Sequence, residues 1–205
     1  MKPLFQKSVR LTLAVLALVA VSSLNSCVST NIRSARVRTY AGAPKKIFLK
    51  VQSNPEYNMF LRGIAWKIED ALRARGIAVN LYIYEALSDR DNARMIEKYI
   101  STFGADLVLE MAQTAQSSDW INTVPTYTGD TFNGGQSYLH SSSTLSLRLI
   151  DRTNEQSVWK AKITNKTNSV FSDMKTGSGV EKTARKVIEA LVKDGILQPL
   201  EEPNK

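Results

Sequence analysis

The sequence predicts an α/β fold of the mixed α+β kind, in one domain over residues 45–197. Residues 47–111 show a strand–helix–strand–helix–strand order with short connections, which is typical of right-handed crossovers and parallel pairing. An antiparallel hairpin and a C-terminal helix follow, so the expected sheet is mixed. About 160 residues follow residue 44, enough for one hydrophobic core. Residues 198–205 are expected to form a frayed tail.

The first part of the domain alternates short apolar strands with amphipathic helices. The expected strands cover residues 47–51, 77–83 and 107–111, where apolar residues alternate with others. The expected helices cover residues 56–75 and 88–103, where apolar residues recur at spacings of three and four. Gly76 and Gly104 follow these helices and favour their termination. The first helix is expected to bury Phe60, Leu61, Ile64, Ile68 and Leu72.

The second part predicts a hairpin with one apolar and one basic face. Apolar residues alternate with polar ones on both sides of a turn at residues 151–155. The apolar positions are Leu145, Leu147, Leu149, Trp159, Ala161 and Ile163. Lys160 and Lys162 fall on the opposite face. A last helix is expected over residues 179–193, with Asp194 and Gly195 at its end.

Residues 1–26 predict a lipoprotein signal peptide. Three basic residues and no acidic one precede Cys27, and residues 11–21 form an apolar run that is too short to span a bilayer but typical of a signal sequence. Cys27, the only cysteine, ends the run Leu24-Asn25-Ser26-Cys27, which resembles a bacterial lipobox. The resemblance implies cleavage before Cys27 and its acylation by chains such as palmitate. The alternative is an ordinary signal peptide cleaved nearby, with Cys27 incidental.

Residues 27–44 are expected to form the acylated cysteine and a basic tether. Cleavage of the signal peptide lowers the formal charge of the chain from +8 to +5, because it removes three cations and no acid. The tether is expected to be solvated, to touch anionic headgroups, or to form an edge strand over residues 36–40. The residue after the cysteine is Val28 and not Asp, and by resemblance to enterobacterial lipoproteins this favours the outer membrane. Nucleic acid is not an expected partner, since an exported lipoprotein does not meet it routinely.

The hairpin also carries a family resemblance. Its pattern L-x-L-x-L-I-D-x(6)-V-W-x-A, after the strand–helix–strand–helix–strand core, resembles a group of bacterial envelope lipoproteins. The group includes uncharacterised lipoprotein families, the penicillin-binding-protein activator lipoproteins, the curli-secretion lipoprotein and the N-terminal domain of TolB. Their hairpins often carry D-x-x-T-G-x-x-x-W, in which Asp151 and Trp159 match and Asn154 is assigned to the glycine position. The resemblance covers about residues 45–197 and implies the fold rather than an activity.

Residue types exclude most catalytic and metal sites. His140 is the only histidine, and Cys27 is assigned to lipid, so a Cys/His metal cluster and a cysteine nucleophile are not expected. His140 and Ser141 are neighbours in an expected strand and point to opposite faces, and no G-x-S-x-G motif occurs. Asp119 and Asp130 are the residues to test for acid–base chemistry. We expect no enzyme, no cofactor and no metal.

Aromatic residues are the candidates for partner binding. Residues 117–136 form a segment longer than compact domains leave without regular structure. Its rings are expected to bind a partner, to stack on sugars, to cover the core as a lid, or to extend the hairpin. Trp66 is expected on the solvent face of the first helix, where the tether or a partner covers it. The candidate partner-binding residues are Trp120, Tyr127, Phe132, Tyr138 and Trp66.

Together these features predict a lipid-anchored, periplasm-facing lipoprotein of a Gram-negative envelope. We expect it to act as a non-catalytic interaction module in envelope assembly or maintenance, bound to membrane lipid through Cys27 and to a protein partner through its aromatic residues. The alternative is a lipoprotein that binds peptidoglycan or another carbohydrate. An envelope hydrolase is the least favoured class.

Overall fold

The computed structural model describes most of the chain after the expected signal peptide. The described residues are 28–37, 40, 42–53, 58–85, 90–122, 126–128, 131–133, 137–169 and 177–200. The signal peptide, Cys27 and Asp130 lie outside the described residues, as does the tail after Leu200. No helix in the described part of the chain is long and apolar enough to cross a membrane.

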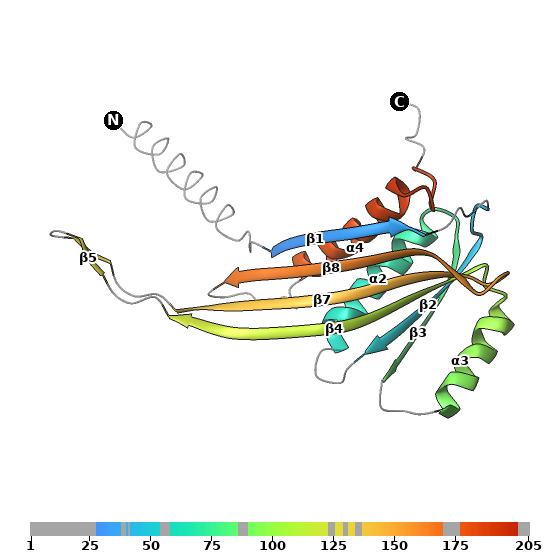
Figure 1. Cartoon of the computed structure of the whole chain (residues 1–205), viewed down its shortest axis with the longest axis horizontal. Coiled ribbons are helices and arrows are strands. Elements are labelled where there is room, and N and C mark those ends of the chain that lie inside the picture. The colour runs from blue at the N-terminus through green and yellow to red at the C-terminus, as the bar shows by residue number, and fades with distance from the viewer. Residues whose placement is uncertain are drawn as a thin grey trace, which may run out of the picture.

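A six-stranded mixed sheet forms the centre of the molecule, which confirms the predicted fold class (Figure 1). Its strand order is β1-β8-β7-β4-β2-β3. The long strands are β1 (Val28–Arg36), β2 (Lys46–Ser53), β3 (Ala78–Glu85), β4 (Leu107–Asn122), β7 (Ser137–Asp151) and β8 (Gln156–Ser169). A separate two-stranded ribbon joins β5 (Thr126–Thr128) to β6 (Thr131–Asn133).

The predicted strand–helix core is confirmed. β2 pairs in parallel with both β3 and β4, and the connections are α2 (Asn58–Arg73) and α3 (Arg90–Phe103). The five predicted apolar residues of α2 are all buried. Gly76 and Gly104 follow the two helices with φ of 74° and 66°, a left-handed conformation that suits glycine at a helix end.

The helices cover the two faces of the sheet unequally. α2 and α4 (Gly177–Lys193) pack together against one face, which we call the inner face, and bury the main core there. On the outer face, α3 covers only the part formed by β3, β2 and β4, where Phe48, Ile96, Ile100 and Val108 form a second small core. Figure 1 shows α2 and α4 behind the sheet, with β1, β8 and β7 in front of them.

The expected tether contains a strand. β1 occupies residues 28–36 of it and pairs antiparallel with β8. Val28 lies opposite Thr167, and Ile32 lies opposite Ile163. The strand begins eight residues before the edge strand that we considered over residues 36–40. Only Val28 and Ile32 are large apolar residues on its inner side, and this weak alternation explains why the sequence pattern does not indicate a strand.

Residues 117–136 also contain more regular structure than expected. β4 continues to Asn122 and pairs with β7 to the register Asn122↔Ser137, and the β5–β6 ribbon follows. The described backbone of this segment therefore agrees with an extended hairpin, made by β4 and β7. Ser and Thr residues follow one another along both strands, so neither shows the apolar alternation that marks Leu145–Leu149.

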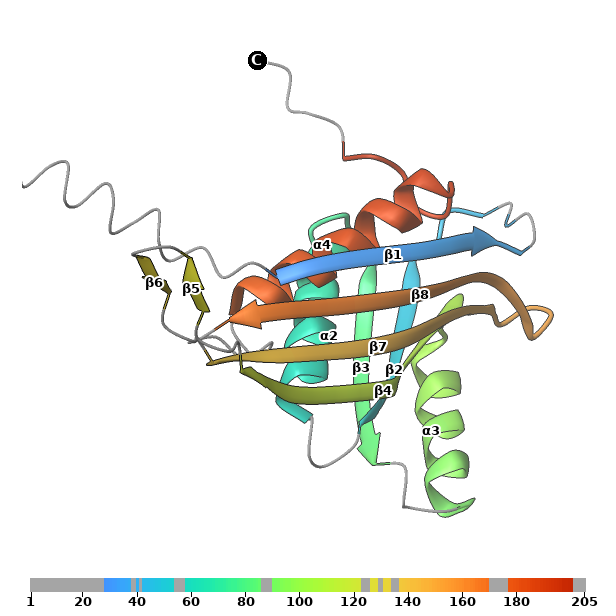
Figure 2. The ribbon, with the colours of Figure 1, turned by 60° about the vertical axis from the view of Figure 1, so that its left-hand side comes forward.

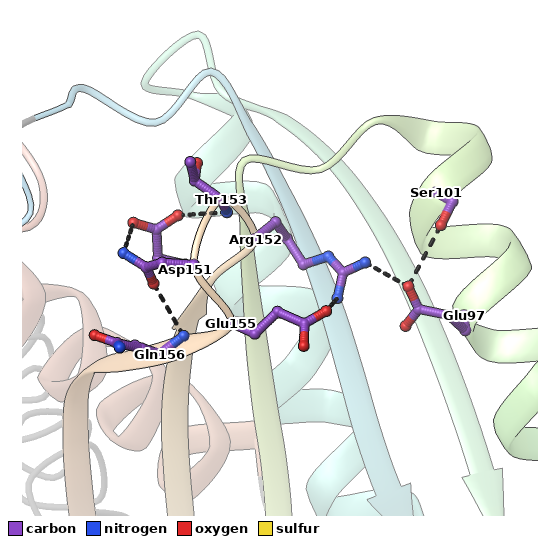
Figure 3. Close-up of polar contacts among 8 residues, drawn as sticks. Glu97, Ser101, Asp151, Arg152, Thr153, Glu155 and Gln156 are labelled. Atoms are coloured by element: carbon purple, nitrogen blue, oxygen red, sulfur yellow. Dashed lines mark hydrogen bonds and ion pairs between the residues drawn. The ribbon is translucent and has the colours of Figure 1, made fainter.

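The β7–β8 turn is held by its own side chains (Figure 3). Asp151 accepts a hydrogen bond from the backbone N–H of Thr153 (2.8 Å), and Asn154 accepts one from the backbone N–H of Gln156 (3.0 Å). Glu155 has a φ of 55°, the only positive φ among described residues other than glycine. In the family pattern the glycine is the fourth residue after Asp and the fourth before Trp. Counted from Asp151 and Trp159, this position is Glu155, so our assignment of it to Asn154 is wrong.

Candidate functional site

Four of the five predicted binding residues fall on two strand ladders: Trp120 and Tyr138 near the end of the β4–β7 ladder, and Tyr127 and Phe132 in the β5–β6 ribbon. We define the arm as residues 120–139, of which 120–122, 126–128, 131–133 and 137–139 are described; at its base, Leu139 makes the last β7–β8 pair with Ser169. Its backbone places Trp120 opposite Leu139, Tyr138 opposite Ile121, and Tyr127 opposite Phe132. Figures 1 and 2 show β5 beyond the end of the six-stranded sheet, away from α3.

The arm leaves the sheet at the end where β1 begins. Thr167 of β8 pairs with Val28 on one side and with Ser141 on the other. Two residues further along β8, Ser169 pairs with Leu139 at the base of the arm. Two residues of a strand span about 7 Å. Val28, the residue after Cys27 in the sequence, and the base of the arm thus lie at the same end of the sheet.

Trp66 lies apart from the arm, on α2. Its side chain is 50% exposed, as the sequence predicts, and the Arg62 guanidinium lies over the indole at 5.3 Å from the ring centroid. Met59, about two turns away on the same helix, is 79% exposed. β1 pairs with the sheet edge instead of covering Trp66, so the described residues of the expected tether do not provide its cover.

The outer side of β1, β8 and β7 forms an open basic face. Its cations alternate along the strands with buried inner residues, and all are exposed: Arg33, Arg148, Lys160, Lys162 and Lys166. Arg148 is bonded to Glu110 of β4 (3.2 Å). Among the described residues, no carboxylate lies within ion-pair distance of the other four. The face is therefore strongly cationic toward β1 and neutralised toward β4.

A shallow hollow of about 430 Å³ lies on this face between β1 and β8. It is lined by Ser29, Asn31, Arg33, Lys162, Thr164 and Lys166. All six side chains carry hydrogen-bond donors and none is acidic, which is the donor set that binds phosphate, sulfate or carboxylate groups. The sequence predicts the Lys160 and Lys162 side of this face. It does not predict Arg33 there, because residue 33 was assigned to the tether.

Two of the residues that the sequence singles out for catalysis lie on paired strands. His140 pairs in register with Asp119, while the Ser141 hydroxyl is buried and lies 3.0 Å from the Ser118 hydroxyl. Within the described ranges, no three His, Cys, Asp or Glu side chains are grouped to hold a metal ion. The arrangement offers strand surfaces and donors for binding.

Comparisons with known proteins give matches at the level of fold. No protein-family model matches the chain, and no curated protein matches it. A solved structure of the PelC dodecamer from Paraburkholderia phytofirmans is 19% identical over 80% of this chain and 97% of its own, with a TM-score of 0.47. Lipoprotein GNA1162 from Neisseria meningitidis is 16% identical over 73% and 96%, with a TM-score of 0.39. A minor lipoprotein from Acinetobacter baumannii is 8% identical over 73% and 94%, with a TM-score of 0.37. The last two are bacterial lipoproteins by description, and likeness at these scores assigns no function.

Proposed function

We propose that this protein is an envelope lipoprotein, anchored through acylated Cys27, that acts as a non-catalytic interaction module in envelope assembly or maintenance. The observation that carries the proposal is the shared end of the molecule: the strand that follows Cys27 and the base of the arm lie on the same stretch of β8. An anchored domain with this layout presents its arm next to the membrane in which the anchor sits.

The anchor is supported by the sequence around it. A lipobox-like run ends at Cys27, and an unpaired thiol in an exported protein is a liability that acylation removes. Several acyl chains give effectively permanent attachment, since each buried methylene contributes about 0.8 kcal/mol. The outer membrane is the proposed destination, because Val28 and not Asp follows the cysteine.

The partner surface is supported by the composition of the arm. Trp120, Tyr127, Phe132 and Tyr138 place four aromatic residues on 20 residues of chain. Aromatic residues are enriched where proteins bind one another, because they contribute a large contact area at little entropic cost. A protein partner is therefore the occupant that we propose.

Two measurements in intact cells test the proposal. A metabolic fatty-acid probe should label the wild-type protein and leave Cys27→Ser unlabelled. A photo-crosslinking residue at Tyr127 or Trp120 should capture one envelope protein, whereas the same residue at Arg185, which is exposed on α4, should not. Labelling of the Cys27→Ser protein would disprove the anchor. Crosslinks from Tyr127 only to peptidoglycan fragments would replace the protein partner with a glycan.

A further inference from the structure

We propose that the basic face lies on the anionic phospholipid headgroups of the membrane that holds Cys27. This inference rests on the anchor in the proposed function and adds a second, electrostatic contact on a different surface from the arm. The contacting groups are the cations that the described carboxylates leave unpaired: Arg33, Lys160, Lys162 and Lys166.

The charge pattern fits a phosphate surface. Arg33, Lys162 and Lys166 line one hollow, together with the hydroxyl and amide groups of Ser29, Asn31 and Thr164. Lys160 and Arg148 lie along an adjoining hollow, and neither hollow is lined by an acidic residue. Phosphate oxygens accept hydrogen bonds from all of these donor types.

The position of the anchor brings the face to the membrane. Cys27 is one peptide unit from Val28, and consecutive Cα atoms are about 3.8 Å apart. Ser29, the next residue, pairs with Lys166, and Arg33 pairs with Lys162 further along the same two strands. The paired stretch of β1 from Ser29 to Ala35 is about 20 Å long, and Ala35 lies opposite Lys160. With Cys27 held at the membrane by an acyl chain, Lys166 would lie opposite Ser29, only two positions after the anchor. The other cations would follow within about 20 Å along the same two strands.

The proximity also selects phospholipid over a soluble anion. Once the anchor holds the protein on the membrane, the headgroups next to the basic face have a high effective concentration. They therefore outcompete soluble anions for this face. The face is polar, with alternating serine, asparagine, threonine and basic side chains, and so it suits contact with headgroups rather than insertion among acyl chains. Each cation in such a contact increases partitioning of the protein onto the anionic membrane about fivefold, and salt weakens the contact.

Lysine footprinting on the whole acylated protein tests the inference. The protein is reconstituted into vesicles of phosphatidylcholine alone or of phosphatidylcholine with phosphatidylglycerol, and amine labelling is read by mass spectrometry. On the anionic vesicles, Lys160, Lys162 and Lys166 should be labelled about fivefold more slowly, and high salt should remove the difference. Lys67, exposed on α2 across the sheet, is the internal control and should be labelled equally on both.

A charge-reversal pair supplies the matched variant. Lys162→Glu with Lys166→Glu should abolish the protection of Lys160 on anionic vesicles. The same change of charge in Lys67→Glu with Lys98→Glu, at exposed helix positions, should preserve it. Protection that survives the first pair would overturn the inference.

The remaining outcomes separate this inference from the proposed function. Equal labelling of the three lysines on both kinds of vesicle, in protein that floats with the vesicles, would overturn the basic-face contact and leave the anchor intact. Protein that carries no acyl chain and fails to float would contradict the anchor itself. Protection by soluble polygalacturonate, with none from anionic vesicles, would make the face a site for an acidic polymer and would also overturn the inference.

Discussion

Glu155 is the residue whose backbone conformation most clearly conflicts with its side chain. Its φ of 55° lies in the left-handed region, which costs a residue with a Cβ about 1–2 kcal/mol. Its ion pair with Arg152 is long (3.8 Å) and its side chain is 78% exposed, so little electrostatic stabilisation would be lost on substitution. We expect Glu155→Gly to raise the free energy of unfolding by about 0.5–1 kcal/mol.

Denaturant unfolding measures this effect. Glu155→Ala is the control, because alanine removes the same ion pair but keeps the Cβ and should give no gain. An equal stability of the glycine and alanine variants would contradict a strained backbone at this position.

Tyr40 makes stability sensitive to alkaline pH. Burial raises the pKa of its phenol above the ordinary value of 10.0, and the negative charges of Asp106 and Asp151 raise it further. A pKa that is higher in the folded state gives a contribution to stability that is present below about pH 10 and lost as the pH rises through the folded value. Tyr40→Phe should therefore show a smaller loss of stability above about pH 10. Urea unfolding midpoints of the two proteins, measured across alkaline pH, give this loss of stability. The same dependence of the midpoint on pH in both proteins would contradict the prediction.

Partners far apart in the chain mark the limit of what residue patterns predict. The buried position of Trp159 follows from the alternation of the hairpin and is confirmed, since its side chain is fully buried. Its indole N–H donates to a carboxylate oxygen of Asp194 at 2.7 Å, across 35 positions of sequence. Nothing in the local pattern indicates that pair, because it depends on where α4 ends relative to β8.

At the level of elements, β1 is expected to stabilise the fold rather than serve as a tether. Ile32 packs against the main core and lies opposite Ile163, while its neighbour Asn31 is exposed on the outer side. Ile32→Asp should lower the free energy of unfolding by about 1–3 kcal/mol, because it places a charge against apolar residues. Asn31→Asp should change it by less than about 0.5 kcal/mol. Equal effects of the two substitutions in denaturant unfolding would restore the tether interpretation.

The elements differ in how far the sequence could predict them. Amphipathic spacing indicates α2, α3 and α4, and apolar alternation indicates β2, β3 and the central part of the hairpin, all of which are confirmed. β1 and the extension of β4 to Asn122 depend instead on backbone pairing between polar segments. Such pairing is fixed by the neighbouring strand, which is distant in the sequence, so a local pattern does not show it.

In the molecule as a whole, the two faces of one sheet differ in what covers them, and so do its two ends. The helices α2 and α4 cover the inner face and build the core, whereas the outer face of β1 and β8 remains open and basic (Figure 2). The arm and the start of β1 share one end. The sequence predicts the aromatic candidates themselves, but not which strand positions they face, because Trp120 and Tyr138 depend on the β4–β7 register and Tyr127 and Phe132 on the β5–β6 register.

The most direct test of the account is to remove the arm and measure partner capture in intact cells. Replacing residues 120–139 with Asn-Gly joins Asp119 to His140, which are already paired, through a turn that suits two antiparallel strands. The account predicts that this variant is still acylated, unfolds within about 1 kcal/mol of the wild type, and no longer captures its envelope partner after chemical crosslinking. Undiminished capture of the same partner by the correctly folded, armless protein would contradict the central claim.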